Sequence, residues 1–521
     1  MRRLVLFLAI AALAAGTAPL FAQLASDPND RMYTDLKLWE DRGLVQNLPQ
    51  LKPYPIQLLK KLLSDVQDKG NPDDAARARA YYADMDGVIH IHPGTGLEAR
   101  TDFRNAYLQY TFLGGPFQGS LDPLVSYSTW FAGVANNAPG DALEPGPISR
   151  SPVDYISDPG VTSIGGVFPR VSLASAASIG SDRFWFQAGD IRGSWGPFWG
   201  DNAVLSPMAP QSGQFSVVYR GDNFTAMDSV MAISAVNDDG SGAPQPQKFL
   251  ALHGLELYLL PWLTVGIFES VVWGPRFEPF YLLPYAVHFY SQGLISYPDN
   301  SFIGINASLK LPENVRVDFM AYFDDMSFND IVRLNFNTRM KFAAQGGVSW
   351  TPNQPLLARL SFEALMITPY TYSHSDPSTG TLNYLDYSNA GQNMGPSLDP
   401  DSLRLELNAL LRPDPAVDVK PFARLILRGN ASAALPTGNG TIFDDGTQVT
   451  PPAYESFHFL DQSVIEKRFQ LGADTSAFFT LPFGSLKLYA TYTFEYILDA
   501  GLSAGAMAVN NYLTLGFFYQ I

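Results

Sequence analysis

The chain has 521 residues, a formal net charge of −16 and no cysteine, and only 16% of its residues are charged. Ordinary soluble domains carry roughly 25% charged residues. The acidic balance argues against nucleic-acid binding, which requires basic patches. The absence of cysteine excludes a disulfide-stapled secreted domain and a lipid-anchored lipoprotein.

The N-terminus has the pattern of a secretory signal peptide. Arg2 and Arg3 precede an apolar run from Leu4 to Leu13, small residues follow, and Ala22 is a plausible cleavage point. The run is too short and wrongly flanked for a membrane helix. We therefore expect a signal peptide over residues 1–22 and export of the mature chain.

Three helices are predicted next, over Asp30–Arg42, over Pro55–Lys69 and from Pro72 to about Met85. In the first, Met32, Leu36 and Trp39 fall on one face, and Gly43 stands where a helix C-cap is expected. Three short helices bury little apolar surface by themselves. We therefore expect residues 23–87 to form a small bundle that docks on the rest of the chain.

From about residue 88 the hydrophobic pattern changes to a period of two. In Val315–Phe323 the apolar residues alternate with Arg316, Asp318 and Tyr322. Strands of about ten residues are long enough to cross a bilayer at a tilt. Inward charges of both signs suit a polar lumen but are costly in a dry core. In Leu356–Ala364, Ala358 and Leu360 are likewise expected on the outer face and Arg359 on the inner face. The same alternation occurs in Leu403–Leu411, Leu486–Tyr496 and, at the end of the chain, Tyr512–Ile521.

The last strand, Tyr512–Ile521, would be an exposed hydrophobic edge unless the sheet closes on itself. For this stretch alone, a half-buried strand of a soluble sandwich is the alternative. The inward charges of the other strands favour a membrane barrel. We therefore expect an all-β transmembrane barrel of about 18 antiparallel strands over residues 88–521, with the three-helix bundle docked on it.

Connection lengths support this prediction. Short turns alternate with long connections, and outer-membrane barrels place short turns in the periplasm and long loops outside the cell. One hairpin is expected to turn near Pro261, where the most apolar stretch of the chain is interrupted. The long connections are Arg192–Gly213, Gly274–Asn300, Asp324–Thr338, Thr368–Asp401, Asn430–Glu466 and Asp499–Ala506.

Several short motifs are spread along the mature chain. They are Asp30-Arg31-Met32-Tyr33, Gly189-Asp190-Ile191-Arg192, His253-Gly254-Leu255, Pro369-Tyr370-Thr371-Tyr372-Ser373-His374 and Gly391-Gln392-Asn393-Met394-Gly395-Pro396. These segments resemble the Wzi family of capsule-assembly outer-membrane proteins. The family usually carries a Tyr-His-rich stretch where this chain has Tyr384–Ser388. The resemblance implies an eighteen-stranded barrel, a periplasmic helical bundle that closes its inner mouth, and a surface lectin that holds capsular polysaccharide.

The long loops are rich in residue types that bind sugars. Aromatic faces cover sugar C–H groups, amides and carboxylates take hydroxyls, and arginine can pair with an acidic sugar. The alternative is that these residues form an interfacial aromatic girdle or pack the loops. The candidate ligand-binding residues are Trp195, Trp199, Asp201, Asn202, Arg276, His288, Tyr370, Tyr372, His374, Asp386 and Tyr387.

We favour a non-enzymatic lectin of the cell outer membrane that anchors or organises capsular or other surface polysaccharide. A diffusion porin and an outer-membrane enzyme acting on lipid or sugar are the alternatives. No catalytic motif is recognised, the six histidines are scattered, and no cofactor or metal site is expected. The expected partners are outer-membrane lipid, surface polysaccharide and, during insertion, the barrel assembly machinery, with the protein as a monomer.

Overall fold

The computed structural model describes residues 25–137, 163–233, 247–284, 286–295, 298–324, 332–333, 335, 340–374, 385–430, 441–442 and 457–521. The predicted signal peptide, residues 1–22, lies outside these ranges, as does the start of the Tyr384–Ser388 stretch. Within the described ranges, no helix is both long and apolar enough to span a membrane.

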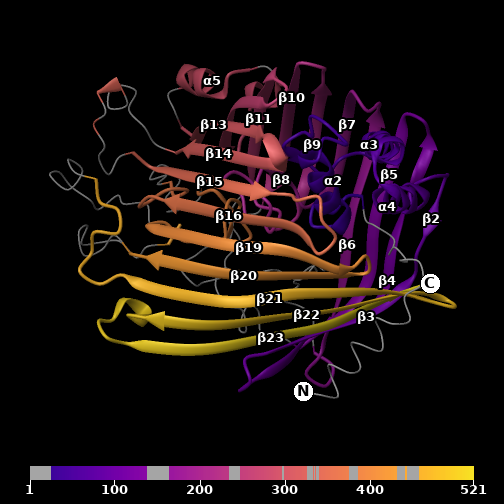
Figure 1. The fold of residues 1–521 in the computed structure, drawn as a ribbon. Helices are drawn as coiled ribbons and strands as arrows, with labels where there is room; N and C mark the ends of the chain where they lie inside the picture. The colour runs from indigo at the N-terminus through magenta and orange to yellow at the C-terminus, as the bar shows by residue number, and fades with distance from the viewer. Residues whose placement is uncertain are drawn as a thin grey trace.

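The described part of the chain forms a closed barrel of 18 antiparallel strands, as predicted (Figure 1). Closure is made by the last strand, which pairs with the first from Leu513↔Thr101 to Gln520↔Gly94. The strands are β3 (Gly94–Thr101), β4 (Ala106–Asp122), β5 (Val125–Asn136), β6 (Phe168–Gly180), β7 (Phe184–Ile191), β9 (Ser212–Arg220), β10 (Phe224–Ile233), β11 (Lys248–Leu260), β12 (Leu263–Trp273), β13 (Asn300–Leu311), β14 (Val315–Phe323), β15 (Phe342–Trp350), β16 (Leu357–Ile367), β19 (Ser402–Asp414), β20 (Val417–Arg428), β21 (Glu466–Leu481), β22 (Gly484–Leu498) and β23 (Met507–Gln520).

The two faces of the wall follow the predicted alternation. In β14, Arg316 and Asp318 are buried inside, whereas the Phe319 side chain is 42% exposed on the outside. A polar interior within an apolar outer surface is the arrangement of a membrane-spanning barrel. The fold is therefore that of an outer-membrane β-barrel, and the expected hairpin near Pro261 is present between β11 and β12.

One predicted orientation is wrong. Ala358 was expected to face outward with Leu360, but it is only 6% exposed and packs inside against Leu38 and Leu410. The pairing of β16 with β19 shifts between Leu357 and Arg359, which marks a β-bulge. A bulge adds one residue to one strand and breaks the alternation of its side chains locally.

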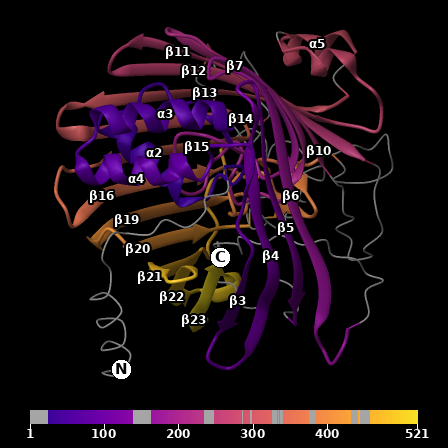
Figure 2. The same ribbon diagram turned by 90° about the vertical axis from the view of Figure 1, so that its right-hand side faces the viewer.

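The three predicted helices are present as α2 (Arg31–Asp41), α3 (Ile56–Lys69) and α4 (Pro72–Ala83). The Asp30 side chain caps α2 by accepting from the amide of Met32, and Asn71 caps α4 with Pro72 in its first turn. Figure 2 shows the helices within the ring of strands, at one end of the barrel. They plug the lumen, and we refer to residues 25–87 as the plug.

Buried ion pairs hold the plug to the wall. Asp35 lies 2.6 Å from Arg412 and 3.3 Å from Arg77, and it accepts a hydrogen bond from the Tyr81 hydroxyl. Burial would raise the pKa of Asp35, but the guanidinium groups of Arg412 and Arg77 lower it below its usual value. Asp35 is therefore ionised at neutral pH. A second cluster joins Glu40 of α2 to Arg316 of β14, at 2.6 Å.

Apolar packing joins the plug to much of the wall. A continuous buried cluster joins Trp39 and Leu59 of the plug to Met227, Leu250 and Phe302 of the wall. These wall residues belong to β10, β11 and β13. Around β19 and β20 the plug makes both kinds of contact, since Leu38 packs on Leu410 and Arg31 pairs with Asp418 at 2.9 Å.

A lysine within the plug makes its docking pH-dependent. Burial, and secondarily the charge of Lys37, lower the pKa of Lys52 to about 8. This value lies below the pKa of about 10.4 that a lysine has in the unfolded chain. The free-energy cost of burying the charged lysine is therefore fully present below pH 8, and it disappears as the pH rises to about 10.4. We expect Lys52→Met to stabilise docking by about 1 to 3 kcal/mol at pH 7. Docking of the wild type should become more stable as the pH rises, whereas docking of the variant should not change. The stability of docking is measured by the protection of residues 25–87 from protease in urea, at pH 7 and at pH 10. The exposed Lys61→Met is the control; equal shifts in both variants would contradict the assignment to Lys52.

Candidate functional site

Two long loops fold back into the lumen from the end of the barrel opposite the C-terminus. They are residues 192–211, between β7 and β9, and residues 368–374 with 385–401, which are the described part of the connection between β16 and β19. Within the first, β8 (Ser194–Trp195) pairs with β1 (Leu51–Lys52) of the plug. The amide of Ser206 donates to the carbonyl of Met394, which joins the two loops to each other at 2.9 Å. Both loops therefore line the interior.

Most of the predicted ligand-binding residues are used to pack these loops. Trp195, Tyr372 and Tyr387 are at most 1% exposed. The Tyr372 hydroxyl donates to the carbonyl of Ala203 at 2.6 Å, and the Tyr387 hydroxyl donates to that of Val204 at 2.9 Å. With their rings buried and their hydroxyls occupied, the two tyrosines hold the two loops together.

The other polar candidates in the two loops make local contacts. Asn202 accepts from the amide of Phe198 at 3.1 Å, and Asp386 accepts from the amide of His374 at 2.6 Å. Tyr370 is 3% exposed, and its φ of 61° places it in the left-handed region. A direct role of these four candidates in ligand binding remains a prediction. Their contacts in the structure are those of residues that pack the loops, which was the alternative interpretation.

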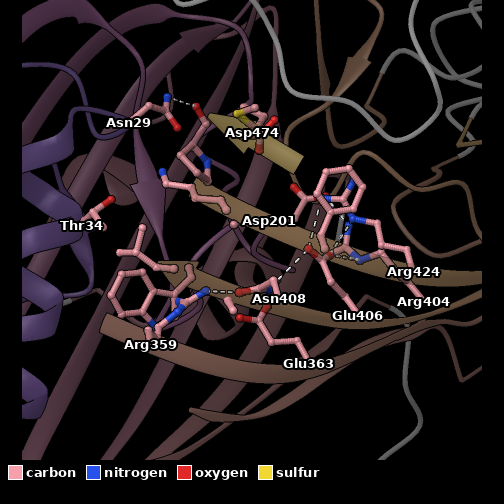
Figure 3. Close-up of a pocket in the computed structure, with 18 of the residues that line it drawn as sticks. Asn29, Thr34, Asp201, Arg359, Glu363, Arg404, Glu406, Asn408, Arg424 and Asp474 are labelled. Carbon is pink, nitrogen blue, oxygen red and sulfur yellow. Dashed lines mark hydrogen bonds and ion pairs between the residues drawn. The ribbon is translucent and has the colours of Figure 1, made fainter. Parts of the chain in front are cut away.

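Trp199 and Asp201 differ from the rest, because they line a pocket of about 270 Å³ (Figure 3). The pocket lies between the first loop, the plug and the wall strands β16, β19, β20 and β21. Its charged lining residues are Asp201, Arg359, Glu363, Arg404, Glu406, Lys420, Arg424 and Asp474. The sequence pattern placed several of these strand residues on the inner face, but only the fold brings them together.

Asp201 anchors the first loop to the wall. Its carboxylate accepts from Arg404 at 3.1 Å, from the amide of Ser397 at 2.9 Å and from the Ser206 hydroxyl at 2.5 Å. Charge-assisted bonds of this kind are stronger than neutral ones. Asp201 is therefore a positioning residue that fixes the rim of the pocket.

Arg359 has the most unusual environment in the pocket. Its guanidinium carbon lies 3.7 Å from the centre of the Trp199 ring, a cation–π contact, and Nη2 donates to Asn408. Its Nε and Nη1 find no hydrogen-bond partner among the described residues, although both are buried. Unused donors on a buried cation are costly, so an anionic oxygen in the pocket would be stabilised strongly.

The remaining charges form a fixed frame. Glu406 lies 3.0 Å from Arg424 and 3.7 Å from Arg404. Lys420 is exposed within the pocket and Asp474 is partly exposed. The pocket therefore offers free cationic donors together with carboxylate acceptors, which suits a polyhydroxylated ligand that also carries negative charge.

Arg276 and His288, the last two candidates, lie away from this pocket. They belong to the connection between β12 and β13, where Arg276 pairs with Asp299 and His288 is fully buried. The predicted site residues are thus divided between two inward loops, one lumen pocket and one separate connection. Sequence reasoning missed Arg359 as a site residue, although its inward position was recognised.

The closed wall, the plug and the inward loops define an 18-stranded outer-membrane barrel with an occupied lumen. No family model matches the sequence, and no curated protein matches it. Among solved structures, the chain is similar to Wzi of Escherichia coli, described as an outer membrane protein involved in group 1 capsule assembly and a carbohydrate-binding β-barrel. The TM-score is 0.59 at 11% identity, over 94% of this chain and 97% of that one.

Two solved structures from Pseudomonas aeruginosa are less similar to this chain. OccD3 (OpdP) has a TM-score of 0.46 at 12% identity, over 84% of this chain and 92% of that one. OccK10 (OpdN) has a TM-score of 0.44 at 9% identity, over 84% and 99%. The resemblance to Wzi indicated by the sequence motifs is therefore confirmed at the level of the fold.

Proposed function

We propose that this protein is a glycan-binding barrel of the outer membrane that holds acidic surface polysaccharide, capsular or otherwise, at the lumen pocket. The observation that carries the proposal is Arg359, a buried guanidinium stacked on Trp199 with two nitrogens unused. A sugar carboxylate would accept from these donors, and the carboxylates of Glu363 and Asp474 would accept from hydroxyls. The carbohydrate binding reported for the similar barrel Wzi supports the same class of ligand.

The proposed role is binding without catalysis. Asp201 and Glu406 are each held by an arginine, at 3.1 and 3.0 Å. These two carboxylates are therefore occupied in fixing the loop and the wall and are not open to a reacting group. A diffusion porin needs an open lumen, whereas in this barrel the plug and the two inward loops pack together across it. These features favour the lectin over both alternatives.

Retention of polysaccharide on the cell tests the proposal. We expect a deletion strain to make surface polysaccharide in normal amount but to shed it into the medium, and complementation to restore retention. Complementation with Arg359→Met should fail, whereas Arg183→Met, in the exposed turn before β7, should succeed. Polysaccharide that stays on the cells of the deletion strain would refute an anchoring role.

A further inference from the structure

The connection between β12 and β13 covers part of the outer surface of the barrel. It contains a short 3₁₀ helix, η1 (Pro279–Leu282), and a helix, α5 (His288–Leu294). Figure 2 shows α5 outside the ring of strands. Tyr281 of η1 packs on Trp273 with ring centres 5.1 Å apart, over the buried Ala251 and Val271. We refer to the described residues of this connection, 274–284, 286–295 and 298–299, as the flap.

The wall beneath the flap carries polar groups on its outer face. Phe268 and Val272 of β12 belong to the interior cluster, so Glu269 between them points outward. His253 of β11 is its direct cross-strand partner. A histidine and a glutamate facing lipid would be strongly unfavourable. The flap removes them from the lipid, since Glu269 is only 7% exposed.

His288, the first residue of α5, completes a cluster with these two residues. The rings of His253 and His288 have centres 3.9 Å apart, and His253 Nε2 lies 2.7 Å from Glu269 Oε1. One ligand atom from each of the three residues lies within 4.8 Å of the other two. Two imidazoles and one carboxylate are a common ligand set for zinc and other first-row divalent ions.

The hydrogen bonds of the cluster are incomplete in a way that points to a ligand. Both ring nitrogens of His288 and Nδ1 of His253 are buried without a hydrogen-bond partner in the described structure. Asp228, the cross-strand partner of His253 on β10, also has an oxygen, Oδ1, in this condition. Buried polar atoms without partners are rare and costly. A positive ion would use the nitrogen lone pairs that no donor reaches.

Hydrogen bonds explain why the Glu269 side chain can be buried, but they do not explain the burial of His288. Glu269 accepts from the amides of His288 and Phe289, at 2.6 and 3.1 Å, and so caps α5. The His288 ring is fully buried against His253 and Tyr281, but this capping gives its two nitrogens no hydrogen bond. A neutral imidazole always has one unprotonated nitrogen, which is the atom that a metal ion binds.

We propose that His253, Glu269 and His288 bind a divalent first-row transition-metal ion and that the ion fastens the flap to the barrel. Zinc is bound by three protein ligands of this kind where its fourth position stays open to water. The outward side of the flap is apolar, with Phe277, Leu283, Val287, Phe289, Tyr290 and Leu294 each more than half exposed. The ion would thus hold an apolar cover against the wall. No metal site was expected from the sequence, because His253, Glu269 and His288 lie on three separate elements of the fold.

Metal binding by the purified full-length barrel in detergent tests the proposal. After treatment with a chelator and dialysis, zinc titration followed by elemental analysis should give about one ion per chain. His288→Gln should weaken zinc binding more than tenfold, and so should His253→Gln. The matched control is His458→Gln, since His458 pairs with Asp461 outside the flap. A wild-type protein that retains no zinc or cobalt, or binding that survives in both flap variants, would overturn the proposal.

A second measurement does not depend on how well the variants fold. Cobalt added to the wild-type protein should give the visible absorption of a four-coordinate site with nitrogen and oxygen ligands, and zinc should abolish it. Zinc should also protect the flap from protease in the wild type. Cobalt absorption typical of the fully hydrated ion would show that no such site exists.

Discussion

Replacing Asp35 with asparagine is expected to release the plug and make a silent barrel conduct ions. Asparagine keeps the shape of the side chain but removes the charge that faces Arg412 and Arg77. Removing one partner of a buried ion pair costs about 3 to 5 kcal/mol, because the other charge is left uncompensated. The undocked population should therefore rise by roughly two to four orders of magnitude.

Conductance of single barrels in planar bilayers measures this effect, and protease sensitivity of residues 25–87 confirms its origin. The control is Asp65→Asn on α3, whose partner Lys61 is half exposed, so the change should be within about 0.5 kcal/mol. Because arginines lower the pKa of Asp35, its contribution to docking is complete above the unfolded pKa of about 3.9 and is lost only as pH falls through the lowered value. The wild type should thus stay silent at pH 5. A silent Asp35→Asn barrel would show that the loops alone close the lumen.

Replacing Arg359 with methionine is expected to reduce the affinity for an acidic oligosaccharide by about 10- to 100-fold. Methionine keeps an apolar stem against Trp199 but removes the unused donors. A hydrogen bond to a charged group contributes about 1.5 to 3 kcal/mol, which corresponds to that range.

Titration calorimetry with a uronic-acid oligosaccharide and with its carboxyl-reduced form separates the two parts of this expectation. The wild type should prefer the acidic form, and Arg359→Met should bind both forms equally weakly. Arg183→Met, which loses only an exposed pair with Asp222, should behave as the wild type. Unchanged preference in Arg359→Met would place acid recognition elsewhere in the barrel.

The wall of the barrel was largely predictable because its physical constraints are local. Alternation places Arg316 and Asp318 on one face whatever the rest of the chain does, and the predicted strand Val315–Phe323 has the bounds of β14. The error at Ala358 came from a bulge, which depends on how β16 is paired with β19. Pairing of this kind is not visible in the pattern of a single strand.

The interior was much less predictable because it depends on contacts between distant segments. Tyr372 and Tyr387 look equally suited to bind a sugar or to pack a loop. In the structure their hydroxyls donate to the carbonyls of Ala203 and Val204, more than 160 residues away, so both side chains pack the loops. The stacking of Arg359 on Trp199 likewise joins a strand to a loop that folds inward. Sequence motifs indicated which loops matter, but not that their aromatic side chains face the lumen.

The order of events during assembly follows from the contents of the lumen. Arg31 of the plug bonds to Asp418, which lies 387 residues further along the chain. Both residues lie inside the ring of strands, which closes where β3 pairs with β23. Because Asp418 belongs to β20, this ion pair forms only after β20 has been made and placed. The N-terminal segment is made first, yet its contacts with the wall are completed late in assembly. A chain without its first 87 residues would have only the two inward loops inside its ring of strands.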